Sequence, residues 1–275
     1  MDSTLAKGLA VLDWLARQPD GARVADVAAA FGLARSNAHR TLRTLVECGW
    51  ARQDEATSHY RASLRLFELG TLLGAADTVP ARVRPHLQAL AAATGETIHL
   101  ARLDGAEIVY LDKFDSPLPV AAYSRIGGRA PACCVASGKA LLATMAHDPA
   151  ALRERFPAPL VAHTPNSIVD FAGLAAELDR TAARGWAENR EEWRLGVCGL
   201  GAPVFDARGV AVVAVGMSVP SIRFGRAQAK ALAGRLLACA RDASAELGLR
   251  LQPEPLAAAA RRGPTPPPRR PASHG

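Results

Sequence analysis

The sequence has 275 residues, enough for about two domains that each bury a hydrophobic core. Hydrophobic residues make up 49% and charged residues 21%, as in ordinary soluble proteins, and the longest uncharged apolar run, 210–219, is far shorter than the roughly 20 residues of a membrane helix. The net charge of +7 is spread along the chain, so overall basicity alone does not indicate nucleic-acid binding.

Residues 1–63 predict a winged helix-turn-helix. A first helix begins at Ser3 or Thr4 and ends before 19–21, and a second helix from about Val24 ends at Gly32. A third helix over 35–47 buries an apolar side, and the alternating segment 50–63, with a turn at 54–57, predicts a two-stranded wing. The apolar positions of the first helix are Leu5, Leu9, Leu12 and Leu15, and those of the third are Ala38, Leu42 and Leu45.

The exposed side of the third helix has the side chains of a DNA-reading helix. Arginine pairs with guanine and asparagine with adenine in the major groove, and no acidic residue lies between Asp26 and Glu47 to repel phosphate. A solvated helix in a small bundle is the alternative, but it does not explain the glycine turn, the missing acids and the wing together. The predicted DNA-binding residues of this helix are Arg35, Ser36, Asn37, His39, Arg40 and Arg43.

The wing adds Arg52, Tyr60 and Arg61 as predicted DNA-binding residues, with phosphate as their expected partner. For Tyr60 a place in the core of the wing is an equally open interpretation. Residues 64–77 form an apolar segment that predicts a linker helix and a contact in a homodimer.

Residues 78–252 predict a second domain with an antiparallel sheet, because its strands are joined as hairpins. The predicted strands are 97–103, 107–114, 120–126, 199–205 and 210–219; the predicted helices are 82–93, 135–145, 150–155, 173–184 and 226–247. The fold class is therefore α/β of the α+β kind. Residues 253–275 form a Pro/Ala/Arg-rich tail that cannot build a core, and its arginines are either solvated or in contact with nucleic acid or membrane.

Three separated motifs resemble the IclR family of bacterial transcriptional regulators, over residues 3 to 250. The segment 36–45 is similar to the recognition helix of that family. The motif Gly128-Arg129-x-Pro131, running into Gly138-Lys139-Ala-Leu-Leu-Ala, resembles the hallmark of the effector domain, and so does Gly185-Trp186, followed by Glu191-Glu192, Gly196 and the segment 201–206.

The resemblance implies a GAF-like effector domain that binds a small organic acid, in a homodimer or tetramer that activates or represses transcription. It implies double-stranded operator DNA as the partner and a pocket formed by Ala136, Ser137, Asn189, Gly199, Gly216 and Ser218. Asn189, Gly199 and Gly216 replace an acid, a cysteine and a serine of some members, which predicts a different or larger ligand. Arg125 is a further effector-binding candidate, with a surface ion pair as the open alternative, and His99 is expected to line the same cavity.

Local chemistry agrees with a pocket there. Ser137 lies where a loop turns into a helix, so free N–H groups and a hydroxyl are available for a carboxylate; a simple helix cap is the alternative. The effector is expected to move the linker helix and so the spacing of the two DNA-reading helices.

The remaining motifs predict no enzyme, no catalytic residue, no metal and no cofactor. Lys139 is not followed by Ser or Thr as a P-loop requires, and no ligand-spaced Cys/His cluster occurs. A redox-sensing regulator that uses Cys133, Cys134 or Cys198 remains an alternative, and a GAF-like enzyme is a weaker one. No signal peptide or membrane segment is evident, so a cytoplasmic protein with reduced thiols is expected.

Overall fold

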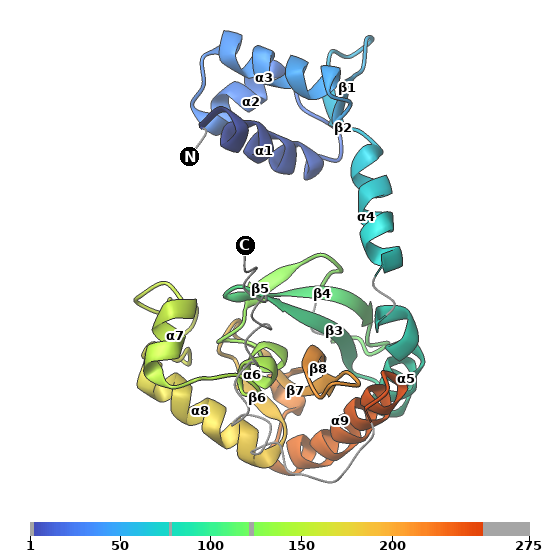
Figure 1. The fold of residues 1–275 in the computed structure, drawn as a ribbon, viewed down its shortest axis with the longest axis vertical. Helices are drawn as coiled ribbons and strands as arrows, with labels where there is room; N and C mark the ends of the chain where they lie inside the picture. The colour runs from blue at the N-terminus through green and yellow to red at the C-terminus, as the bar shows by residue number, and fades with distance from the viewer. Residues whose placement is uncertain (1–2, 77–78, 121–123, 250–275) are drawn as a thin grey trace, which may run out of the picture. The chain divides into compact units, whose positions relative to one another are not determined.

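The computed structural model describes residues 3–76, 79–120 and 124–249, and their packing divides the chain into two units, Met1–Thr78 and Val79–Gly275 (Figure 1). The predicted tail at 253–275 lies outside the described residues. None of the helices in the described ranges combines the length and hydropathy needed to cross a membrane.

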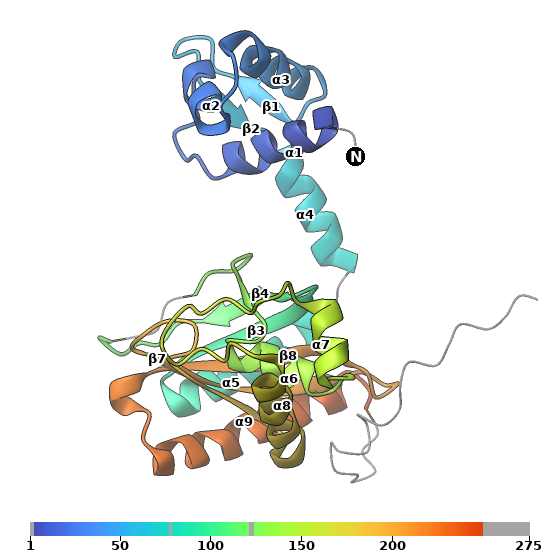
Figure 2. The ribbon, with the colours of Figure 1, turned by 90° about the vertical axis from the view of Figure 1, so that its left-hand side faces the viewer.

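The first unit is the predicted helix-turn-helix with a β-hairpin (Figure 2). Its elements are α1 (Ser3–Ala16), α2 (Val24–Phe31), α3 (Arg35–Glu47), β1 (Ala51–Gln53), β2 (Tyr60–Ala62) and α4 (Arg65–Ala76). The turn between α2 and α3 depends on Gly32, whose φ of 60° is left-handed, and the next N–H, of Leu33, closes the turn on the carbonyl of Ala28 at 2.9 Å.

The core of this unit lies where α1, α2 and α3 meet. Val11, Leu15, Val27, Ala38 and Leu42 are fully or almost fully buried there. The apolar stripe predicted for α1 is covered only in its second half, because Leu5 and Leu9 are exposed while Leu12 and Leu15 are buried. The exposed leucines are thus available for a contact outside this unit.

Helix α4 begins directly after the hairpin. The Arg65 guanidinium donates to the carbonyl oxygen of Cys48 at 2.9 Å and lies 4.7 Å above the Trp50 ring, which fixes the start of the helix to α3 and the wing. Further along, Phe67 is 72% exposed and Leu72 is also exposed. An apolar helix face is therefore left uncovered within the described unit.

The second unit contains a six-stranded, fully antiparallel sheet in the order β5-β4-β3-β8-β7-β6, which confirms the predicted antiparallel sheet. Its strands are β3 (Thr97–Asp104), β4 (Glu107–Phe114), β5 (Arg129–Pro131), β6 (Ala187–Arg190), β7 (Val197–Phe205) and β8 (Ala211–Pro220). Its helices are α5 (Val79–Thr94), α6 (Ala136–Leu142), α7 (Pro149–Arg155), α8 (Phe171–Arg184) and α9 (Arg226–Glu246), with the 3-10 turn η1 (Ser221–Arg223).

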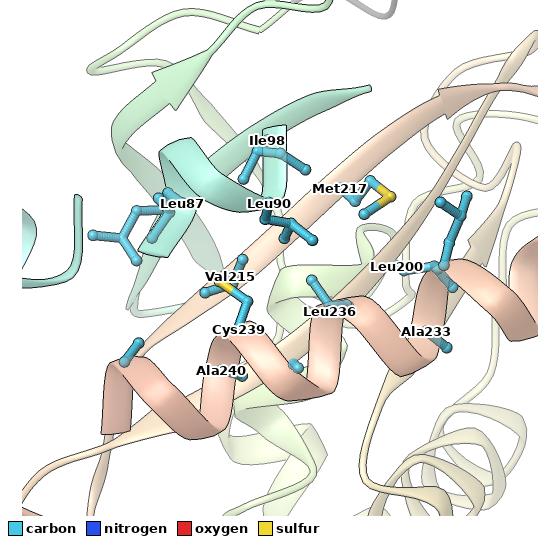
Figure 3. Close-up of a cluster of buried hydrophobic side chains, with 14 of the residues drawn as sticks. Leu87, Leu90, Ile98, Leu200, Val215, Met217, Ala233, Leu236, Cys239 and Ala240 are labelled. Atoms are coloured by element: carbon cyan, nitrogen blue, oxygen red, sulfur yellow. The ribbon is translucent and has the colours of Figure 1, made fainter. Parts of the chain in front are cut away.

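One face of this sheet packs on α5 and α9. Leu87 and Leu90 of α5 and Leu236 of α9 are buried against Ile98 and Val215 of the sheet (Figure 3). Burial of large aliphatic side chains at this level supplies most of the stabilisation of such a core. The opposite face is covered by α6, where the small residues Ala136 and Ala140 of the helix pack with Ala214 of β8.

Two local predictions for this unit are wrong. The predicted strand 120–126 does not form: residues 121–123 lie outside the described residues, and 124–126 are not in a strand. Instead Gly127 adopts a φ of 74° and the Gly128 N–H donates to the Arg125 carbonyl at 3.0 Å, so the chain turns here. Its first backbone hydrogen bonds to β4 join Gly127 and Gly128 to Tyr110, at 2.8 and 3.0 Å, and strand β5 begins at Arg129. The predicted helix 135–145 is confined to Ala136–Leu142, because the chain leaves the helix after the Ala143 cap.

Candidate functional site

Helix α3 has two chemically different sides. Ala38, Leu42 and Leu45 face the core of the first unit. The predicted DNA-binding residues Arg35, Ser36, His39, Arg40 and Arg43 are exposed, and Asn37 is half-buried. The structure therefore leaves the predicted residues of this helix on its solvent-exposed side, opposite the core.

The charges on this surface differ in their partners. Arg40 donates to Asn37 Oδ1 at 2.5 Å, and Arg43 pairs with Glu47 at 2.7 Å. Within the described chain, Arg35 and Arg40 take part in no salt bridge. Their charges thus have no carboxylate partner among the described residues, whereas Arg43 is partly neutralised.

In the wing, Arg52 is exposed and lies directly opposite Arg61 in the strand register. The prediction that Tyr60 contacts DNA is wrong, because its side chain is 3% exposed and packs in the core of the first unit. Alternation along β2 turns Tyr60 inward, where its backbone pairs with Ala22. Arg61 is half-buried and packs against Gly21. A Cβ on Gly21 would lie 2.7 Å from Cγ of Arg61, so a larger residue there would displace the arginine.

The second unit contains a cavity of about 130 Å³ on the α6 side of the sheet. That volume is several times the ~10–15 Å³ that one water requires, so a small organic molecule fits. The strand register explains why distant residues meet here: Asn189 of β6 lies opposite Gly199 of β7, which lies opposite Ser218 of β8. The predicted effector residues that line the cavity are Arg125, Ala136, Ser137, Asn189, Gly199 and Ser218.

Gly216 is predicted as an effector residue but is not among the residues that line the cavity. It lies opposite His99 in the register of β3 and β8, and a Cβ on Gly216 would lie 2.2 Å from Nε2 of His99. Glycine at this position therefore makes room for the imidazole, which lines the cavity in its place.

Several cavity residues do not follow from the sequence prediction. Tyr110 lies on β4, Ser124 is in the segment wrongly predicted as a strand, and Trp193 and Arg194 are in the loop after β6. Loop residues have no periodic pattern to reveal them. The one available signal is that Trp193 and Arg194 directly follow the Glu191-Glu192 motif.

The cavity contains polar groups that lack partners. Ser137 Oγ, Ser124 Oγ and His99 Nδ1 are buried without a hydrogen-bond partner in the described structure, and all three residues line the cavity. A buried, unsatisfied polar atom costs about 1–3 kcal/mol. Their gathering around one hollow indicates a site for a polar molecule.

The charges around the cavity are of one sign. No Asp or Glu is among its lining residues, while Arg125, Arg129 and Arg194 are. Arg129 is paired with Asp104 and Glu107, at 2.5 and 2.6 Å. Arg125 and Arg194 have no carboxylate partner within the described ranges, although Arg194 lies 5.8 Å from the Trp193 ring. The cavity therefore favours an anion.

The aromatic wall of the cavity is uncharged at neutral pH. Burial, with a smaller contribution from the charge of Lys113, lowers the pKa of His99 to about 4. Burial raises the pKa of Tyr110 to about 12. The two rings meet edge to face at 4.8 Å, so they form a rigid polar wall that offers hydrogen bonds without charge.

The helix argument for carboxylate binding is weaker than expected. Helix α6 has only 7 residues, so the dipole at its N-terminus is small. The feature of Ser137 that remains is its buried hydroxyl, which has no partner within the described residues.

The predicted redox cysteines are buried. Cys133 Sγ and Cys134 Sγ are 3.6 Å apart, and Cys198 is buried elsewhere in the same unit. The hydrogen bond from Cys134 lowers the pKa of Cys133, while the same bond and burial raise that of Cys134 and burial raises that of Cys198. Among the residues that the structure describes, no group of three metal-ligating side chains occurs.

Comparison with known proteins adds independent findings. Residues 4–55 match the model of the IclR helix-turn-helix domain, and residues 75–245 match that of the bacterial transcriptional regulator IclR C-terminal domain. The chain is 30% identical to the HTH-type transcriptional regulator XynR of Escherichia coli K12, over 82% of this chain and 89% of XynR.

Solved structures agree. The Thermotoga maritima IclR is similar with a TM-score of 0.71 and 30% identity, over 90% of this chain and 100% of that one. An IclR homologue from Microbacterium hydrocarbonoxydans, solved in complex with 4-hydroxybenzoate, shares the fold with a TM-score of 0.74 and 23% identity, over 89% of this chain and 99% of that one.

We expect Gly216→Ala to displace the His99 ring and to lower the free energy of unfolding by about 1–3 kcal/mol, because the new methyl group cannot coexist with Nε2. Thermal unfolding measures this. The control is Gly234→Ala on the open side of α9, where a Cβ meets nothing within 4 Å and should be neutral or stabilising. Equal melting temperatures for the two variants would contradict the close contact.

We expect the free energy of unfolding to fall as the pH drops from about 6.5 to about 4. In this window the unfolded chain binds a proton at His99 and the folded chain does not, because the folded pKa is about 4 and the ordinary value is 6.5. The contribution of this group is about 3 kcal/mol. Chemical denaturation across this pH range should show a shallower slope for His99→Gln than for the unmodified chain; identical slopes would refute the shifted pKa.

Proposed function

Because the chain belongs to the IclR family of bacterial transcriptional regulators, we propose that it controls transcription in response to a small organic acid held in the cavity of its second unit. Like its relatives, it is a transcriptional regulator with a helix-turn-helix DNA-binding domain, and not an enzyme. Binding to chromosomal DNA would place it in the cytoplasm.

The observation that carries the effector proposal is the polarity of the cavity. It combines unpaired guanidinium groups, buried polar atoms without partners, and no acidic residue in its wall. A carboxylate would accept hydrogen bonds from Ser137 and from the arginines, and an apolar or aromatic body would pack on Trp193 and Val197. Because a homologue of this fold holds 4-hydroxybenzoate, that acid is the first probe to test.

The DNA part of the proposal assigns base contacts to α3. Arg35 and Arg40 are exposed at its solvent-facing side, and Arg52 of the wing would bind phosphate. We further propose a homodimer that reads two half-sites. Its support is the uncovered apolar side chains Leu5 and Leu9 of α1 and Phe67 and Leu72 of α4.

We propose that the acid changes DNA affinity through α4, with a coupling free energy of roughly 1–3 kcal/mol. By linkage, operator DNA must change the affinity for the acid by the same factor. A redox switch at Cys133, Cys134 or Cys198 is the alternative. The burial of all three thiols argues against it, and operator binding unaffected by hydrogen peroxide would exclude it.

We expect Arg40→Ala to weaken operator binding by about 1–3 kcal/mol, because it removes an exposed base-reading group without touching the core. Fluorescence anisotropy at fixed salt measures this on the promoter of its own gene. Arg17→Ala, which removes an equal charge from the turn after α1, is the control for net charge and should lose little. Equal losses for both would mean that Arg40 acts only through net charge.

We expect Ser137→Ala to weaken 4-hydroxybenzoate binding by about 1.5–3 kcal/mol, because a hydroxyl that bonds a charged group is lost. Ser137→Trp should abolish binding by filling the cavity, while operator binding without ligand survives in both variants. Calorimetry of the acid and anisotropy of the DNA separate the effects. Normal acid binding by Ser137→Trp would show that the acid binds elsewhere.

A further inference from the structure

An ammonium group is buried beside the effector cavity. Lys139 of α6 is 0% exposed, and its Nζ donates to both carboxylate oxygens of Glu192, at 2.7 and 2.8 Å. An oxygen of a second carboxylate, Oε1 of Glu177 on α8, is 3.9 Å away. Removing such a charge from water costs several kcal/mol, which these partners must offset.

The two carboxylates are not equivalent. Glu177 is also held by Arg180 and Arg184 of its own helix, at 2.8 and 2.9 Å. Glu192 has no guanidinium partner within the described structure; its charged partner is Lys139, and its Oε1 also accepts a long bond from the Arg190 backbone N–H at 3.4 Å. Lys139 and Glu192 therefore balance each other's charge, while Glu177 is balanced mainly by Arg180 and Arg184.

Glu192 connects this pair to the cavity. Its backbone N–H donates to Oδ1 of Asn189 at 2.9 Å, and Asn189 lines the cavity. Because the backbone group is a donor, the amide atom that faces it has to be oxygen. The Asn189 amide is therefore oriented, and its Nδ2 makes no hydrogen bond within the described residues.

The turn that carries Glu192 needs to be held. Glu191 has a φ of 59°, a left-handed conformation that is unfavourable for a residue with a side chain. Thr164 Oγ1 donates to the Glu191 carbonyl at 2.6 Å and Ser167 Oγ to the Glu192 carbonyl at 2.7 Å. These bonds fix the carbonyls, and Lys139 of α6 fixes the Glu192 side chain.

We propose that Lys139 and Glu192 are positioning residues that hold the Asn189 amide with its NH2 group toward the effector, so that the cavity prefers a carboxylate to the matching carboxamide. This inference rests on the proposed effector function and names the residues that set its selectivity. Hydrogen bonds from a fixed donor are about twice as strong to a charged acceptor as to a neutral one. A released amide can rotate and offer Oδ1 to a carboxamide, and the preference is lost.

The energetics favour a positional role over a stabilising one. A buried ion pair replaced by apolar or neutral groups of similar size often leaves stability unchanged or improved, whereas removal of one partner alone is strongly destabilising. The double variant Lys139→Met/Glu192→Gln therefore keeps size and removes both charges together. It separates positioning from folding, which Lys139→Met alone does not.

The experiment uses the full chain and two matched pairs of probes, 4-hydroxybenzoate with 4-hydroxybenzamide and pyruvate with pyruvamide. Calorimetry gives the ratio of acid to amide affinity. We expect the double variant to lose about tenfold in that ratio, the order of the difference between a hydrogen bond to a charged acceptor and one to a neutral acceptor. The control Arg82→Met/Glu246→Gln removes an exposed pair between α5 and α9 and should keep the ratio.

A double-mutant cycle tests whether the effect passes through Asn189. In an Asn189→Ala background, the Lys139→Met/Glu192→Gln change should no longer alter the acid-to-amide ratio. A purely structural role predicts instead a lower melting temperature and equal losses for acid and amide in both backgrounds, which would overturn the proposal.

Failure of the two proposals can be told apart. A wild-type chain that binds neither these acids nor others in a thermal-shift panel of mono- and dicarboxylates contradicts the proposed effector function, and this inference with it. A wild-type chain that binds an acid, while the double variant keeps its acid-to-amide ratio, contradicts only the positioning role.

Discussion

Helix α6 lies against the sheet at a distance that only glycine permits. A Cβ at Gly201 of β7 would lie 2.4 Å from the Ala136 carbonyl, and a Cβ at Gly138 would lie 2.3 Å from the Ala132 carbonyl oxygen. This close contact places Lys139 in the interior and Ser137 at the edge of the cavity. The polar features of the second unit therefore follow from one packing constraint on small residues.

The same face of the sheet explains the shape of the cavity. Across the strands, Gly201 lies opposite Gly216, and Gly216 lies opposite His99. Gly201 leaves room for the backbone of α6, and Gly216 leaves room for the imidazole of His99. Two residues along the strands, and so on the same face, Asn189, Gly199 and Ser218 lie opposite one another and line the cavity. The opposite face is filled by α5 and α9, which leaves the α6 side as the one that holds the hollow.

Charge is distributed differently at the two sites. On α3 the arginines point to solvent, where their charges attract phosphate within about a Debye length. Around the cavity, two arginines face a partly enclosed space without an acidic partner in the described residues, next to a histidine whose pKa of about 4 keeps it neutral. The deeper charge of Lys139 is matched by Glu192 and is directed at protein structure rather than at ligand.

The sequence by itself determined the elements with strong local signals. Helix period and the glycine turn at Gly32 predicted the helix-turn-helix and the exposed side of its third helix, and hairpin turns predicted an antiparallel sheet. Only the tertiary structure decided which polar residues meet. Tyr60 is buried because side chains alternate along its strand. His99, and not Gly216, lines the cavity because the sheet register places the imidazole over the glycine. Lys139 pairs with Glu192, which lies 53 residues later in the sequence. Local propensity reports on neighbours within a turn of helix or a step of strand, whereas a cavity wall is formed by side chains brought together through packing of the whole sheet.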